Sequence, residues 1–201
     1  MTNHASGSSV PIPPDPEPFA PYEVVRSRRI YESRWVGLRA DDVIFPDGKP
    51  GVHHVVEISP AAVVVPVLED GRIALIGQYR YPIGTTHWEV PAGRIDENED
   101  PLLAAERELR EEAGATAREI VRLPGFYAIY GISDHFANVF AALGCRIDHA
   151  TEHESSERIC VKVFTLEEVR ALLSSGQILD AFSALALYRY FDLLERSRST
   201  C

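Results

Sequence analysis

The segment that decides the fold is residues 93–115, GRIDENEDPLLAAERELREEAGA, near the middle of a 201-residue chain. Asp100 followed by Pro101 is typical of an N-cap and first helical residue, and Gly114 is typical of a helix end. The pattern therefore predicts one helix from Pro101 to Ala113. Apolar residues recur along it at three- and four-residue steps and are expected to form its buried stripe. These residues are Leu102, Ala105, Leu109 and Ala113.

The same helix carries closely spaced acidic residues. Glu108 and Glu112 are four residues apart and share one face, and Glu111 lies on the adjoining side. Like charges at this spacing destabilise an isolated helix, so a bound cation is expected to compensate for them. Carboxylates suit Mg2+ or Mn2+, which prefer oxygen ligands. The segment therefore predicts a divalent-metal site.

The alternative is an acidic helix face exposed to solvent, which is the usual reading of a run of charges. Residues 93–115 hold eight acidic residues against three arginines, which is an unusual concentration. The glycine and arginine positions of the segment also fit a longer sequence pattern that includes these glutamates. We therefore favour the metal site.

The spacing G-x5-E-x7-R-E-U-x-E-E-x-G-U, in which U is apolar, resembles the signature of the Nudix hydrolases. A chance match of its fixed identities is expected in fewer than about one in 10^4 chains of this length. The resemblance implies a Nudix α/β/α sandwich with a mixed sheet, and hydrolysis of a nucleoside diphosphate linked to another group X. The fixed positions here are Gly93, Glu99, Arg107, Glu108, Glu111, Glu112 and Gly114.

Two segments before the signature resemble the ADP-ribose pyrophosphatase and nucleotide-sugar diphosphatase branch. They are residues 77–84, GQYRYPIG, and residues 88–93, WEVPAG. This resemblance implies ADP-ribose or another ADP-sugar as substrate, two phosphomonoesters as products, and a homodimer whose N-terminal unit helps to build the partner's site. Two positions depart from the branch: Tyr130 replaces a usual proline, and His135 replaces an acidic residue. ADP-ribose specificity therefore stays open.

Other functions also stay open. The same chemistry could act on GDP-mannose, NADH, a dinucleoside polyphosphate or a small organic pyrophosphate. A different class is a Nudix-fold ligand sensor without turnover. The complete signature and the small room for a second domain disfavour that class.

The resemblance also implies roles for individual residues around the metal. Glu108 and Glu112 would be the main ligands of two or three ions, Glu111 would assist, and the carbonyl of Ala92 would complete the shell. Arg107 would orient the glutamates together with Glu99 through charge-assisted hydrogen bonds.

Further residues are implied to meet the substrate. Arg80 would contact a phosphate, with an exposed strand arginine as the alternative, and Trp35 would stack on the base, with a buried core tryptophan as the alternative. The remaining substrate-binding candidates are Glu89, Ser133 and Asp134.

The general base is expected outside the signature, on the acidic loop at residues 151–157. Glu154 and Glu157 are the candidates, with Glu152 behind them. The alternative is an exposed acidic loop with no role in the reaction. In either case the loop directly precedes a predicted strand.

Three segments organise the chain. Residues 1–20 are rich in proline and serine and are expected to be disordered. Residues 21–58 read as a small antiparallel β unit for dimerisation and base binding, and residues 59–201 as the Nudix domain. Within that domain we expect strands at 61–68, 72–80, 119–123, 135–143 and 158–164, a helix opened by Thr165 and reaching about Ser174, and a last helix at 180–196.

Composition limits the remaining function classes. The pI near 5.2 argues against broad nucleic-acid binding, and no apolar run approaches the roughly 20 residues of a membrane span. The start of the chain lacks a signal-peptide pattern. The three cysteines show no C-x-x-C spacing, so neither zinc nor disulfides are indicated. A reduced, cytoplasmic setting is expected.

Overall fold

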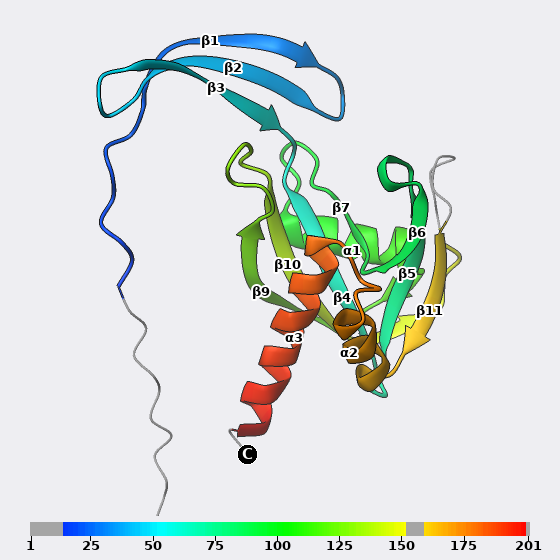
Figure 1. Ribbon diagram of the computed structural model, residues 1–201. Helices are drawn as coiled ribbons and strands as arrows, with labels where there is room; N and C mark the ends of the chain where they lie inside the picture. The colour runs from blue at the N-terminus through cyan, green and yellow to red at the C-terminus, as the bar shows by residue number, and fades with distance from the viewer. Residues whose placement is uncertain (1–13, 152–158, 200–201) are drawn as a thin grey trace, which may run out of the picture.

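The N-terminal unit is a separate three-stranded sheet. The computed structural model describes residues 14–151 and 159–199, and Figure 1 shows this sheet standing beyond one end of the main body. Its antiparallel order is β1-β2-β3, and Gly48 adopts a left-handed φ of 81° in the turn between the last two strands. The strands are β1 (Glu23–Glu32), β2 (Gly37–Ile44) and β3 (Pro50–Glu57).

The main body is built on one eight-stranded sheet. Its central path runs β11-β5-β4-β10-β8, with β6 on β5, β7 on β4 and β9 on β10. Strands β4 and β10 pair in parallel and the other pairs are antiparallel, so the predicted mixed sheet is confirmed. The strands are β4 (Ala61–Leu68), β5 (Ile73–Arg80), β6 (Thr85–Glu89), β7 (Ala92–Arg94), β8 (Ala115–Thr116), β9 (Glu119–Tyr127), β10 (Phe136–Ile147) and β11 (Ile159–Phe164), with a 3-10 turn η1 (Tyr81–Ile83) between β5 and β6.

Helices cover both faces of this sheet, which makes the sandwich (Figure 1). Alternate residues of β4 point to opposite sides, as the period of a strand requires. Ala62 and Val64 pack with helix α1 (Pro101–Ala113) in one cluster. Val63 and Val65 pack in the other cluster with α2 (Leu166–Ser174) and α3 (Ala181–Ser199). One strand, buried over all but its last residue, therefore packs against both layers.

The predicted ends of α1 are confirmed. The Asp100 carboxylate accepts a hydrogen bond from the Leu102 amide at 2.8 Å, and Gly114 ends the helix with a φ of 60°. The predicted place of Leu102 in the buried stripe is wrong, because its side chain is 39% exposed. None of the first three helical residues is buried, so the first turn extends past the sheet. Ala104 completes the buried stripe instead.

The last two helices also begin as the sequence indicates. Thr165 and Glu168 form a reciprocal capping box at the start of α2. Asp180 precedes α3 and accepts a hydrogen bond from the Ser183 amide at 2.7 Å.

Cys145 is buried and Cys160 exposed, and both are free thiols. Within residues 14–151 and 159–199, no helix combines the length and apolar character needed to cross a bilayer.

The burial difference along α1 gives a matched test of this packing. Leu109 is 1% exposed, so Leu109→Ala should lower the free energy of unfolding by about 2–5 kcal/mol through the cavity it leaves. Leu102→Ala on the same helix should cost less than about 1 kcal/mol. Urea denaturation of both variants measures the two losses in the free energy of unfolding. Equal losses would show that the helix packs in a different rotation.

Candidate active site

Two carboxylates of α1 are buried beside strand β7. Glu108 is 7% exposed and Glu112 is 5% exposed. A buried charge requires compensating contacts, and the Ala92 amide donates a hydrogen bond to Glu112 at 2.8 Å. At Gly93 an added Cβ would overlap the Glu108 carboxylate. Glycine at this position therefore lets the strand lie directly against the acidic face of the helix.

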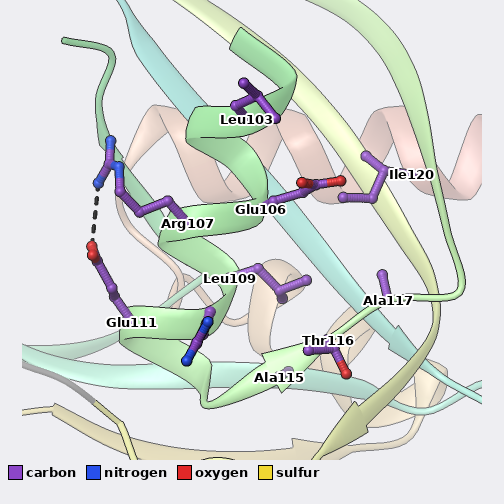
Figure 2. A pocket seen from close by; sticks show the side chains of 10 residues that line it. Leu103, Glu106, Arg107, Leu109, Glu111, Ala115, Thr116, Ala117 and Ile120 are labelled. Atoms are coloured by element: carbon purple, nitrogen blue, oxygen red, sulfur yellow. Dashed lines mark hydrogen bonds and ion pairs between the residues drawn. The ribbon is translucent and has the colours of Figure 1, made fainter. Parts of the chain in front are cut away.

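Arg107 connects the groups around these carboxylates. Its guanidinium donates to both oxygens of Glu99 at 3.0 Å and to the Arg94 carbonyl at 2.9 Å. It also donates to Glu108 at 2.6 Å and to Glu111 at 3.2 Å, the latter contact being drawn in Figure 2. The hydrogen bond with Glu99 is the main reason that the pKa of Arg107 lies above its usual value. Sequence reasoning expected these partners, and the structure brings them together.

A tight loop presents Glu99 to Arg107. Asn98 has a φ of 65°, a left-handed conformation that asparagine tolerates better than most residues. The Glu99 amide donates to the Asp96 carbonyl at 3.0 Å, and the Asp96 amide donates back to the Glu99 carboxylate at 2.9 Å. The Arg107 hydrogen bond is the first cause that lowers the pKa of Glu99, so this carboxylate is held in its charged form.

The residues fit a hard divalent cation by their chemistry. Glu108 and Glu112 supply buried carboxylate oxygens, and Gly93 leaves the backbone beside them uncovered. Glu111, 40% exposed at its side chain, is turned to Arg107. Within residues 14–151 and 159–199, no three His, Cys, Asp or Glu side chains converge as a metal site. Arg107 places a positive charge beside two of these carboxylates, those of Glu108 and Glu111.

A cavity of about 760 Å³, called the main cavity below, lies beside this cluster. Ala92 and Gly93 form one wall, and the helix start at Asp180 forms another. Its polar lining is Trp35, Ser59, Arg80, Thr85, His87, Glu89, Arg94, His135 and Asp180, and its apolar lining includes Ile58, Pro82, Ile83, Leu179 and Phe182.

Arg80 and Glu89 form a two-pronged ion pair in this cavity. The three N–O distances are between 2.5 and 3.1 Å, and Glu89 is only 5% exposed. Burial alone would lower the pKa of Arg80, but the pair with Glu89 raises it, with smaller contributions from Glu112 and Asp180. Glu89 therefore fixes the position of the Arg80 guanidinium and favours its charged form.

Trp35 lies at the rim of the cavity. It is 54% exposed, so the alternative of a buried core tryptophan is wrong. The guanidinium carbons of Arg34 and Arg94 lie 4.0 and 5.4 Å from its ring centroid. The Arg94 side chain also donates to the Arg34 carbonyl at 2.8 Å, which joins the N-terminal sheet to the signature loop. An exposed indole held in place by arginines can stack on a flat ligand.

The loop before β10 contributes differently from the prediction. Ser133 is buried and accepts a hydrogen bond from the His135 amide at 3.1 Å, while Asp134 is exposed. Both border a separate hollow of about 370 Å³ against His53 of the N-terminal sheet. His135 is the residue of this loop that lines the main cavity. The sequence marked this position, because a histidine stands where the family pattern usually has an acidic residue. Sequence reasoning missed His87 and Asp180. The candidate bases Glu154 and Glu157, and Glu152, lie outside the described residues.

A second cavity of about 580 Å³ lies along the other side of α1 (Figure 2). Leu103, Glu106 and Ile120 line it, together with the backs of Arg107 and Glu111. Neither Glu108 nor Glu112 lines either cavity, but Ala92 and Gly93, which lie directly against these carboxylates, line the main cavity. The main cavity is therefore the better place for a substrate that must reach those carboxylates.

Comparison with known proteins agrees with this geometry. Residues 58–183 match the NUDIX domain, and residues 22–56 match the nucleoside diphosphate sugar hydrolase N-terminal domain. The chain is 31% identical to an ADP-ribose pyrophosphatase of Bacillus subtilis (strain 168), over 86% of this chain and 94% of that protein. It is 28% identical to a methanol dehydrogenase activator of Bacillus methanolicus, with the same coverage. A crystal structure of an ADP compounds hydrolase superposes with a TM-score of 0.79 at 21% identity, covering 90% of this chain and 98% of that one.

The role of Arg107 can be tested against Arg110, an exposed arginine of the same helix. Arg107→Ala should lower the free energy of unfolding at neutral pH by about 2 kcal/mol, because several carboxylates lose a charged donor. Activity should fall about 10–100-fold. Arg110→Ala should change both quantities little.

The effect of Arg107→Ala on stability should depend on pH. The pKa of Glu99 is lowered in the folded protein, so its pairing stabilises the fold fully above the pKa of an unfolded glutamate. This stability is lost as the pH falls through the lowered folded value. The difference between wild type and Arg107→Ala should therefore shrink in acid, measured by urea unfolding at neutral pH and at about pH 3. A constant difference would contradict the assignment.

Proposed function

Since the chain belongs to the Nudix family and is a Nudix hydrolase, we propose that it hydrolyses the pyrophosphate bond of a nucleoside diphosphate linked to another moiety, with ADP-ribose or another ADP-sugar as the substrate and Mg2+ as the cofactor. The observation that carries this proposal is the buried pair Glu108 and Glu112 next to a cavity that also holds Arg80. The names of the relatives support an ADP-linked substrate. The products would be two phosphomonoesters.

Glu108 and Glu112, with Glu111 and the Ala92 carbonyl, would hold the divalent cation, which neutralises the diphosphate and lowers the pKa of a bound water. Mn2+ suits the same oxygen donors. Arg107 keeps the glutamates oriented through its hydrogen bonds to Glu108 and Glu111.

Arg80 would bind a phosphate of the substrate. Its pairing with Glu89 fixes one edge of the guanidinium, and the arginine side chain still lines the cavity. Trp35 would stack on the nucleobase at the rim, where its indole is exposed. Ser133 and Asp134 remain candidates for contact with a ligand that extends toward the N-terminal sheet.

The general base is proposed to be Glu154 or Glu157. These residues precede β11, whose first residue Ile159 pairs in register with Gln78, two residues from Arg80. The segment that carries them therefore joins the sheet close to the cavity. A glutamate from it would accept the proton of the attacking water.

We further propose that two copies associate through the N-terminal sheet. Its first strand exposes Val24, Val25, Ile30 and Tyr31 by more than half each. Exposed apolar residues grouped on one strand favour a protein partner. A solution mass equal to the 22.4 kDa of one chain would exclude the dimer.

Substitution of a buried glutamate tests the proposed reaction. Glu112→Gln should abolish Mg2+-dependent phosphate release while the protein stays folded, because the amide keeps the shape and loses the charge that binds the cation. Glu106→Gln, an exposed acid of the same helix, is the control and should keep full activity. Coupled phosphatase assays over ADP-ribose, ADP-glucose, GDP-mannose and NADH provide the measurement.

The same set of four substrates also distinguishes the proposed reaction from the alternative functions. Turnover of GDP-mannose or NADH alone would replace the ADP-sugar by another substrate. Absence of turnover with every member, in a protein that still binds nucleotides, would point to the ligand sensor. Unchanged turnover in Glu112→Gln would remove the metal assignment.

Single substitutions identify the base. Glu154→Gln or Glu157→Gln should lower kcat by about 100-fold, and the affected variant should lose the acidic limb of the pH–rate profile. Glu152→Gln is the comparison within the same loop. If neither candidate loses this much, the base lies elsewhere in the chain.

A further inference from the structure

Ser183 is a polar residue buried on the side of α3 that packs against the sheet. Its side chain is almost inaccessible, with 1% of the residue exposed. The other buried residues of this helix belong to the core cluster on the same face of the sheet: Ala186, Leu187, Tyr190 and Phe191. A hydroxyl in such a place is costly unless it forms a hydrogen bond. Its partner is the Val90 amide, which donates to Ser183 Oγ at 2.9 Å.

The Val90 amide needs a side-chain partner because the backbone changes neighbouring strands at this point. Glu89, the last residue of β6, pairs with Ile76 of β5. Ala92, the first residue of β7, pairs with Val63 of β4. Val90 lies between these two pairings and is only 1% exposed, so water cannot take the place of the missing strand. The serine hydroxyl therefore fills a gap in the hydrogen bonding of the sheet.

Three consecutive residues are thus fixed to three layers of the fold. The Val90 amide is bonded to α3, as described above. The Pro91 carbonyl accepts a hydrogen bond from the Val64 amide of β4 at 2.9 Å. The Ala92 amide donates to the Glu112 carboxylate of α1 at 2.8 Å. Since α1 and α3 cover opposite faces of the sheet, the segment is held from both sides.

The segment continues directly into the acidic face of α1. At Gly93 the backbone lies so close to the Glu108 carboxylate that an added Cβ would overlap it. Such a close fit leaves little room for displacement. The Ala92 carbonyl, proposed above as a metal ligand, lies on this same stretch of backbone. A group that fixes the segment from behind therefore acts on the position of the ligands without touching the cation.

We propose that Ser183 is a positioning residue for the metal site. Its hydroxyl holds the backbone of residues 90–93 in place against Glu108 and Glu112, and in this way raises the affinity for the divalent cation. The inference rests on the proposed function, because the Ala92 carbonyl becomes a ligand only if the cation binds there. Groups that orient metal ligands from behind typically change metal affinity or activity about 10–100-fold when they are removed.

Ser183→Ala tests this role. It removes the acceptor for the Val90 amide and keeps the Ser183 backbone amide, which donates to Asp180 at the start of α3. In calorimetric titrations of the full-length protein with MgCl2 alone, Ser183→Ala should bind Mg2+ at least about tenfold more weakly than the wild type. Ser183→Cys keeps nearly the same volume and offers only a weak acceptor, so it should weaken binding in the same direction and serves if the alanine variant does not fold.

Leu187→Ala is the control for a general loss of stability. Leu187 is fully buried one turn further along α3, in the same core cluster. Its substitution should lower the urea midpoint at least as much as Ser183→Ala does, and should leave the Mg2+ affinity of the folded protein within about twofold of the wild type. Equal weakening in Leu187→Ala would mean that loosening of the core is the cause, and would overturn the positioning role.

Wild-type Mg2+ affinity in both Ser183 variants would also overturn this role, and would leave the proposed function intact. A wild-type protein that binds no Mg2+ would overturn the proposed cofactor and the role of Ser183 with it. In turnover assays, the Mg2+ concentration for half-maximal activity should rise in Ser183→Ala by the same factor as the calorimetric dissociation constant. The two failures are therefore distinguished by the wild-type titration.

Discussion

The burial of negative charge on one face of α1 is the constraint on which the site depends. Glu108 and Glu112 are nearly inaccessible to water, yet a carboxylate in such a place is stable only when donors or cations surround it. The chain supplies them from three directions: the Ala92 amide, the Arg107 guanidinium, and a glycine that lets the backbone approach. The Ala92 hydrogen bond and the close approach at Gly93 require β7 to lie against the helix, whereas the Arg107 contact with Glu108 forms within α1 itself.

The sheet makes this arrangement rigid. Val63 of β4 pairs with Ala92 of β7 and also with Val139 of β10, so the strand that carries the site is fixed by the centre of the core. On the opposite face, Ser183 of α3 accepts a hydrogen bond from the Val90 amide, two residues before Ala92. Both layers of the sandwich therefore hold the segment between β6 and α1. A small shift in either layer would move the glutamates relative to the cavity.

Local signals in the sequence were enough for most elements, and contacts between distant residues were not. The cap at Asp100, the glycine at Gly114 and the capping box at Thr165 act within one helical turn, so their residues alone predicted the helix ends. Leu102 was misplaced because periodicity gives the face of a helix but not how far the sheet beneath it extends. Likewise, His87 and Asp180 carry no motif, and only the folding of β6 against the start of α3 puts them in one cavity.

The distribution of charge within the cavity has a consequence for selectivity. All nucleoside diphosphate derivatives share the diphosphate and differ in the attached moiety. Arg80, proposed to bind a phosphate, would therefore not distinguish one derivative from another. Discrimination has to come from the parts of the cavity that meet the variable moiety. A chain can thus keep the signature helix intact and change its substrate through a few side chains elsewhere in the cavity. His135 lines the cavity at a position where this chain departs from the family pattern.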